Sequence, residues 1–405
     1  MPDWTGSVDR AGVEIHFEVF NRSAPTTVLL VAPSPITHSR IWKAQIPHLA
    51  RQYRVVTFDG RGNGRSGRPT AIEDHTRAAN VADIIAVLDA TDTSAAVVVG
   101  HCHANWWVVD LLSTFPTRVE AFVAISPGVP YLGTPQPHWA SASSTWDTIF
   151  PEPDGWELFN RHVITNEHRR WVEFFFGEQL VEPHSTKQLE DAIAWSLEST
   201  GEILAASEEA QELELPDRAA FEEQCRSISV PTLVVHGDRD VCQHVDKGRA
   251  FAELVGGELV VLEGAGHLAL VRDPVPVNLA ITNFIDRTIS AAPRRRRVWT
   301  RAASRCRRVL YLSSPIGLGH VRRDLAIADE LRRLSPDLEI DWLAQDPVTA
   351  ALLAAGETIH PASDWLSSES AHIASESCGH DLHCFQALRS MDEILVANFM
   401  LFQEV

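Results

Sequence analysis

The chain has 405 residues, of which 45% are hydrophobic and 22% are charged, and its formal net charge is -19. This composition is typical of a soluble globular protein, and the length predicts more than one domain. The negative charge argues against nucleic acid as a general partner, because binding a polyanion requires a positive protein surface.

The chain carries no recognisable targeting segment. No apolar stretch is long enough to cross a bilayer, and the first residues lack the basic and then apolar pattern of a secretory signal. The six cysteines are scattered, which favours reduced thiols over a disulfide framework. We therefore expect a cytoplasmic protein without a membrane span, and the sequence indicates no particular oligomeric state.

Strand and helix patterns alternate through the first part of the chain. Loose alternation of apolar residues over 6–21 predicts one or two antiparallel edge strands. A helix is expected after the loop at 33–38, and another over 76–90. Continuous apolar runs predict strands buried on both faces, at residues 26–32, 53–58, 95–99 and 119–126. This order is typical of an α/β fold with a doubly wound, mostly parallel sheet.

The alternation is interrupted at residues 131–227, which are helical, aromatic and acidic in pattern. Strand and helix patterns then resume, at 231–237, 245–254, 258–262 and 275–289. We expect the interrupting segment to form a cap over the carboxyl ends of the strands, where open sheets bind ligands. Its many Trp and Phe residues predict an apolar pocket for a hydrophobic acyl substrate. Its acidic residues predict a solvated helix face.

The sequence Gly100-His101-Cys102-His103-Ala104 lies between a predicted strand and a predicted helix. A strand that ends on Gly-x-Cys-x-Ala and restarts as a helix has the layout of a nucleophile elbow, with Cys where Ser is usual. Small residues at 100 and 104 suit the strained turn that holds a nucleophile. Cys102 is therefore our candidate nucleophile; taken alone, the motif fits a buried thiol equally well.

A thiol nucleophile needs a base and an acid that orients the base. Asp240 follows the predicted strand at 231–237, and His267 follows the Gly-rich turn Gly264-Ala265-Gly266. We predict Asp240 as the acid and His267 as the base, because nucleophile, acid and His occur in this order in the chain. The turn is expected to point His101 and His103 away from the nucleophile.

For the oxyanion we predict two backbone N–H donors, from His103 and Ser34. His103 follows the nucleophile, and Ser34 lies between two prolines that lack an N–H. Cys242 follows the acid by two residues and could form a redox pair with Cys102, although an ordinary thiol is the simpler interpretation. No cofactor or metal is expected.

Residues 6–290 resemble the α/β-hydrolase superfamily with an inserted cap. Three motifs carry the resemblance: the elbow, the loop Asp59-Gly60-Arg61-Gly62-Asn63-Gly64-Arg65-Ser66, and His236-Gly237-Asp238-x-Asp240 with the turn before His267. We interpret the loop at 59–66 as structural. The superfamily includes esterases, lactonases, C–C hydrolases, haloalkane dehalogenases, epoxide hydrolases and haloperoxidases, so the resemblance implies the fold more specifically than the substrate. Cys102 argues against the dehalogenases and epoxide hydrolases of the superfamily, which carry Asp at the elbow.

The remaining chain differs in composition. An Arg-rich segment at 291–307 is interpreted as a linker between a domain at 1–290 and a unit at 308–405. Within that unit, a predicted strand is followed by Gly317-Leu318-Gly319-His320 and by a predicted helix. This arrangement resembles the start of a GT-B glycosyltransferase, which implies a partial Rossmann-like unit. The spacing of Cys378-Gly379-His380-Asp381-Leu382-His383-Cys384 fits no common zinc site. We expect no transferase activity from this unit alone.

These patterns favour a hydrolase or acyltransferase that acts on an ester, thioester or lactone of a hydrophobic acyl group. A Cys102-His267-Asp240 triad would form a thioester intermediate. Two alternatives stay open: a non-hydrolytic binding or regulatory domain that kept the fold, and an accessory domain of a glycosyltransferase.

Overall fold

The computed structural model describes residues 2–134, 136–180, 182, 186–213, 215–289, 307–314, 318–368 and 391–404. The chain separates into two compact units, Met1–Pro293 and Arg294–Val405. Within the described ranges, no helix combines the length and the hydropathy that crossing a membrane requires.

The first unit is built on an eight-stranded sheet with the order β1-β2-β4-β3-β5-β6-β7-β8. The first two strands form an antiparallel hairpin, and the strands from β3 onward are parallel. The predicted doubly wound sheet with antiparallel edge strands is therefore confirmed. The strands are β1 (Trp4–Arg10), β2 (Val13–Phe20), β3 (Thr27–Val31), β4 (Arg54–Phe58), β5 (Ala96–His101), β6 (Val119–Ile125), β7 (Thr232–Gly237) and β8 (Glu258–Leu262).

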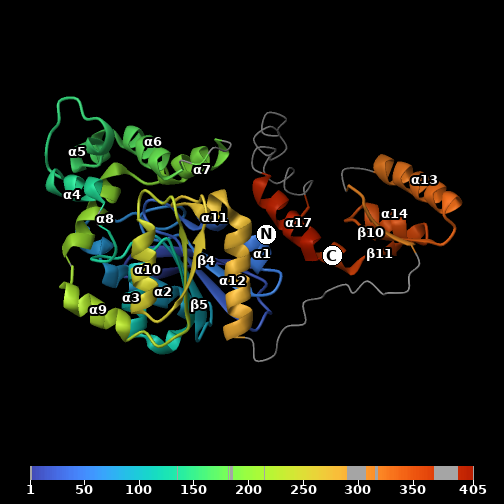
Figure 1. Cartoon of the computed structure of the whole chain (residues 1–405), viewed down its shortest axis with the longest axis horizontal. Coiled ribbons are helices and arrows are strands. Elements are labelled where there is room, and N and C mark those ends of the chain that lie inside the picture. Colours follow the sequence, from blue (N-terminus) through green and yellow to red (C-terminus); the bar gives the residue numbers. More distant parts are fainter. Residues whose placement is uncertain are drawn as a thin grey trace. The chain divides into compact units, whose positions relative to one another are not determined.

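Helices cover both faces of this sheet (Figure 1). In the central strand β5, Val97 and Val99 pack into one core and Val98 into the other, because successive side chains of a strand point to opposite faces. One core includes α1 (Ile46–Leu49), α11 (Ala269–Arg272) and α12 (Pro274–Thr288), and the other α2 (Arg77–Ala90), α3 (Ala104–Thr114) and α10 (Val245–Leu254). In place of the single helix expected after residues 33–38, the chain forms two short helices, η1 (Ser39–Trp42) and α1. Two further short helices are η2 (Ile72–His75) and η3 (Pro116–Arg118).

The segment between β6 and β7 forms a helical cap, and α4 to α7 lie together at one end of the sheet (Figure 1). Trp171, Phe175 and Phe176 are buried in the cap, and the rings of Trp171 and Phe175 stack with centroids 5.1 Å apart. Many of the aromatic residues thus form the cap's own core. The cap elements are α4 (Pro137–Ser144), η4 (Gly155–Leu158), α5 (Arg161–Asn166), α6 (His168–Gln179), α7 (Lys187–Ser196), α8 (Gly201–Leu213) and α9 (Arg218–Arg226).

The second unit contains a small parallel sheet with the order β11-β10-β9. Trp342 is fully buried, and the Arg332 guanidinium donates two hydrogen bonds of 2.7 Å to the Glu357 carboxylate. The GT-B-like and Rossmann-like assignments stay predictions, and Gly317, most of the Arg-rich linker and the motif at 378–384 lie outside the described residues. The elements are β9 (Arg307–Leu312), α13 (Leu318–Leu334), β10 (Leu338–Leu343), α14 (Val348–Ala354), β11 (Thr358–Ile359), η5 (Pro361–Trp365) and α17 (Asp392–Glu404).

The loop at residues 59–66 connects η1 to the cap. The buried Asp59 carboxylate accepts hydrogen bonds from the backbone N–H and hydroxyl of Ser39 and from the backbone N–H of Arg65. The Asn63 amide donates to the backbone carbonyl of the cap residue Trp195 at 3.1 Å. These contacts support the structural interpretation of the loop.

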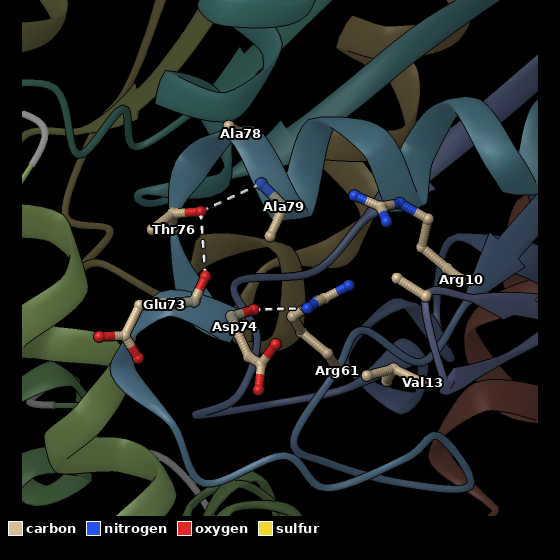
Figure 2. A pocket seen from close by; sticks show the side chains of 9 residues that line it. Arg10, Val13, Arg61, Glu73, Asp74, Thr76, Ala78 and Ala79 are labelled. Carbon is tan, nitrogen blue, oxygen red and sulfur yellow. Dashed lines mark hydrogen bonds between the residues drawn. The ribbon is translucent and has the colours of Figure 1, made fainter.

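A buried ion pair connects the same loop to α2. Arg61 donates two hydrogen bonds of 2.6 Å to the carboxylate of Asp83, and both side chains are almost fully buried. Arg61 also donates to the backbone carbonyl of Asp74, beside a surface hollow of about 270 Å³ that includes Arg10 and Thr76 (Figure 2). The triad residues do not line this hollow.

Replacing Asp83 with Ala should lower the free energy of unfolding by about 3–5 kcal/mol, because the Arg61 guanidinium would stay buried without its counter-charge. Urea denaturation followed by circular dichroism measures the change. Asp89→Ala is the matched control on α2, since Asp89 pairs with Arg118 but its side chain is 64% exposed. The control should cost less than about 1 kcal/mol. Equal losses of unfolding free energy in the two variants would contradict the view that the buried Arg61–Asp83 pair stabilises the fold.

Candidate active site

Cys102 occupies a strained turn between β5 and α3. Its φ is +53°, a left-handed conformation that a residue with a side chain rarely adopts. The backbone N–H of Cys102 donates to the carbonyl of Ile125 at 3.1 Å, and its carbonyl accepts from the backbone N–H of Gly128 and the side-chain amide of Asn105. These bonds hold the turn in place and present the Cys102 side chain at the end of the strand.

Only small residues fit at several positions around the turn, because neighbouring atoms lie too close for a larger side chain. A Cβ at Gly100 would lie 2.6 Å from the amide oxygen of Asn105, and one at Gly128 would lie 2.8 Å from the backbone nitrogen of His103. Ala104 is fully buried. The geometry therefore supports the sequence-based reason for the small residues at 100 and 104, and it adds Gly128, which the sequence analysis did not identify.

Asp240 lies in the turn after β7 and is buried. One oxygen of its carboxylate accepts the backbone N–H groups of Cys242 and Gln243, at 2.9 and 2.7 Å. The other lies 2.8 Å from Nδ1 of His267 and 3.1 Å from Nε2 of His236. Although burial alone would raise the pKa of Asp240, the His267 charge and these hydrogen bonds lower it below its usual range. Asp240 is therefore a carboxylate at neutral pH.

His267 is buried in the loop after β8, where its Nδ1 faces Asp240. Burial would lower the pKa of His267, but the negative charges of Asp240 and Cys102 outweigh that effect and raise the pKa to about 10. The His267 ring also hydrogen-bonds Cys102. The structure thus brings together the three residues that the sequence predicted as nucleophile, acid and base.

The thiol of Cys102 has more partners than the predicted triad supplies. A hydrogen bond with the thiol of Cys242 lowers the pKa of Cys102 most strongly. Burial would raise this pKa, and the charge of His267 lowers it further. Hydrogen bonds with His103 and His267 add to this, and the pKa of Cys102 falls well below its ordinary value. These interactions favour the thiolate form of Cys102 beside the His267 ring.

The expectation that His101 and His103 point away from the nucleophile is wrong for His103. The His103 ring hydrogen-bonds Cys102 and lies 3.4 Å, through Nε2, from the carbonyl of Ser34. Burial would lower the pKa of His103, but its bond to Cys102 raises it. His101 is fully buried, and its Nε2 lies 3.1 Å from the carbonyl of His267. The turn therefore places the His103 ring against the Cys102 sulfur and the His101 ring beside His267.

The predicted oxyanion donor Ser34 requires a correction. Its backbone N–H donates to the carbonyl of Ala32 at 2.9 Å, and its hydroxyl donates to the carbonyl of Thr37 at 3.3 Å. The Ser34 N–H is thus already engaged within the loop. The other predicted donor, the backbone N–H of His103, lies at the start of α3 beside Gly128.

Sequence reasoning missed several residues at the site. His236 precedes Asp240 in a motif that the sequence analysis quoted, but its role as a buried partner of the carboxylate was not predicted. Cys242 was considered as a redox partner of Cys102 but interpreted as an ordinary thiol, whereas its thiol hydrogen-bonds that of Cys102. In the part of the chain that the structure describes, no group of three or more His, Cys, Asp or Glu side chains is arranged to hold a metal ion.

Comparisons with known proteins agree with this architecture. Residues 27–274 match the family described as "alpha/beta hydrolase fold". The chain is similar to 3-oxoadipate enol-lactonase 1 of Acinetobacter baylyi, with 23% identity over 263 residues, or 62% of this chain and 85% of the relative. It is also similar to a non-heme chloroperoxidase of Streptomyces lividans, with 27% identity over 58% of this chain and 83% of the relative.

Two solved structures share the fold. A bromoperoxidase from Bacillus anthracis superposes with a TM-score of 0.59 at 19% identity and covers 70% of this chain and 99% of its own. An enol-lactonase from Burkholderia xenovorans LB400 gives a TM-score of 0.53 at 20% identity, over 69% of this chain and 100% of its own. At these identities the likeness extends to the fold alone.

Alkylation of Cys102 by iodoacetamide should be nearly independent of pH between about pH 6 and pH 8, with less than about a 3-fold change in rate. A thiol with the ordinary pKa of about 8.5 would react roughly 80-fold faster at the higher pH. Peptide mass mapping after timed alkylation measures the rate at each cysteine. Cys225 is the internal control, because burial raises its pKa to about 12 and should leave it unmodified. An 80-fold rise at Cys102 would refute the thiolate.

Proposed function

This chain belongs to the alpha/beta hydrolase family, and on that premise we propose that it hydrolyses an ester, thioester or lactone of a hydrophobic acyl group with Cys102 as the nucleophile. The observation that carries the proposal is the strained Cys102 joined by hydrogen bonds to His267, which is itself bonded to Asp240. The similarity to an enol-lactonase supports esters and lactones as the substrate class.

The resting site holds the nucleophile in its reactive form. A thiolate at Cys102 and an imidazolium at His267 form an ion pair, and the Asp240 carboxylate keeps the His267 ring in the orientation that leaves Nε2 for the reaction. No proton has to leave the thiol before attack. The left-handed backbone of Cys102 keeps the sulfur at the end of the strand.

Acylation begins when the thiolate attacks the substrate carbonyl carbon and a C–S bond forms. The carbonyl electrons move to oxygen, which becomes an oxyanion. When this intermediate collapses, the C–O bond to the leaving group breaks and His267 gives its proton to the departing oxygen. The products of this half-reaction are an alcohol and a thioester on Cys102.

Deacylation uses the same base in its neutral form. His267 takes a proton from water, and the resulting hydroxide adds to the thioester carbonyl. The C–S bond then breaks, the carboxylic acid leaves, and its proton passes to solvent. The thiolate–imidazolium pair is restored. An acyl acceptor other than water would make the protein an acyltransferase by the same route.

The oxyanion needs hydrogen-bond donors aimed at it. We assign the backbone N–H of His103 as one donor. Because the Ser34 N–H is bonded to Ala32, we assign a ring N–H of His103 as the second. Its bond to Cys102 places it beside the carbonyl that would be attached to the sulfur.

The cap supports a hydrophobic acyl group. The indole of Trp139 donates to the backbone carbonyl of Cys242 at 2.6 Å, so the cap contacts the loop beside the nucleophile. Trp139 in turn packs against Trp156 and Phe159, with ring centroids 5.1 and 5.0 Å away. An aromatic cluster in contact with the catalytic loop favours apolar substrates over charged ones.

A binding or regulatory domain without hydrolysis is the second candidate. One observation favours it: the Ser34 N–H, which the family would use for the oxyanion, is bonded within its own loop. In this case Cys102 would be bonded in the same way but would not turn over substrate.

Replacing Cys102 with Ala should reduce kcat/KM for a p-nitrophenyl ester of a hydrophobic acid by at least about 1,000-fold, because the sulfur that would carry the acyl group is removed. Release of p-nitrophenol measures turnover, and circular dichroism checks folding. Cys225→Ala, which changes a buried thiol on α9, is the matched control and should retain most activity. Turnover that survives in the Cys102 variant would exclude the proposed chemistry. A folded wild type that turns over none of a panel of esters, thioesters and lactones would favour the second candidate.

A further inference from the structure

The hydrolytic cycle uses one thiol at the site, but the structure places two there. Cys242 lies two residues after the triad acid, and its backbone N–H donates to the Asp240 carboxylate at 2.9 Å. Its thiol hydrogen-bonds the thiol of Cys102. Neither cysteine is in a disulfide.

The two thiols differ in exposure and in charge. Cys102 is partly exposed, whereas Cys242 is 2% exposed. The hydrogen bond to Cys102 and burial raise the pKa of Cys242 well above its ordinary value, so Cys242 stays protonated and donates to the Cys102 thiolate. An oxidant entering from solvent would therefore meet the nucleophilic sulfur first, with a protonated thiol in contact behind it.

The backbone of Cys242 is held at the site by hydrogen bonds on both sides. Its backbone carbonyl accepts the indole N–H of Trp139 at 2.6 Å, and its N–H is bonded to Asp240. The loop thus cannot withdraw Cys242 from Cys102 without breaking contacts to the cap and to the triad acid.

We propose that Cys102 and Cys242 form an oxidative modification site, in which a hydroperoxide oxidises Cys102 and Cys242 closes an intramolecular disulfide onto it. This oxidation rests on the Cys102 thiolate of the proposed function, but it does not require acyl transfer from Cys102. The disulfide would occupy the nucleophile and stop hydrolysis until a thiol reductant restores both sulfurs.

The chemistry balances in two steps. The Cys102 thiolate attacks one oxygen of hydrogen peroxide, the O–O bond breaks, and a sulfenic acid and hydroxide form; the imidazolium of His267 neutralises the hydroxide to water. Once Cys102 is oxidised it is no longer a thiolate, so the interaction that most raised the Cys242 pKa is gone. The Cys242 sulfur attacks the Cys102 sulfur as it loses its proton, the S–O bond breaks, and the oxygen leaves as water with that proton. Two thiols lose two electrons, and one peroxide is reduced to two waters.

The pairing protects the nucleophile. A sulfenic acid with no thiol nearby is oxidised further to sulfinic and sulfonic acids, which ordinary thiol reductants do not reverse. With Cys242 in contact, ring closure competes with that second oxidation. The pair would therefore convert damage to the nucleophile into a reversible state.

The test is to treat the full chain with stoichiometric hydrogen peroxide, block free thiols with iodoacetamide and map disulfide-linked peptides by mass spectrometry without reduction. The expected product is a linked peptide pair that contains Cys102 and Cys242, and dithiothreitol should release it. Cys102 oxidised to sulfinic acid, or linked to another cysteine, would overturn the proposal.

A pair of variants completes the test. In Cys242→Ala, peroxide should drive Cys102 to sulfinic acid that dithiothreitol does not reverse, whereas Cys225→Ala should form the same disulfide as the wild type. Equal recovery of free Cys102 in the two variants would contradict a role for Cys242. The readout is covalent mass rather than turnover, so a protein that forms the disulfide but hydrolyses no ester would refute the proposed function alone.

Discussion

The active site depends on one buried negative charge, the carboxylate of Asp240. Removing a carboxylate from water is costly unless hydrogen bonds and an opposite charge replace the lost solvation. Two backbone N–H groups and two imidazoles do so here, and the His267 imidazolium supplies the charge. A protonated His267 in turn stabilises a thiolate at Cys102. The charge on Asp240 therefore favours an imidazolium at His267 and a thiolate at Cys102.

The rest of the first unit keeps this arrangement in place. The sheet brings the ends of β5, β7 and β8 to one edge, so that the turns after them carry Cys102, Asp240 and the loop of His267. The left-handed backbone at Cys102 costs on the order of 1–3 kcal/mol and persists because Ile125, Asn105 and Gly128 fix its N–H and carbonyl. Strain at Cys102 is thus offset by hydrogen bonds to neighbouring strands and turns.

Much of this architecture could be predicted from the sequence. The buried strands gave continuous apolar runs, and Cys102, Asp240 and His267 followed such runs in an order that one fold explains. What the sequence could not show is contact between side chains that no motif links. The bond between Cys242 and Cys102, and the ring of His103 turned onto the sulfur, depend on side-chain directions within two turns. The engaged N–H of Ser34 depends on the conformation of a loop between prolines.

The central claim is that the sulfur of Cys102 carries the acyl group during turnover. Its most direct test is to mix the protein with the p-nitrophenyl ester of a bulky hydrophobic acid, quench in acid during turnover, and locate the added acyl mass by peptide mapping. The account predicts an acyl group on Cys102 that neutral hydroxylamine removes, as expected of a thioester. Turnover that proceeds with no acyl group on Cys102, or with the acyl group on another residue, would contradict it.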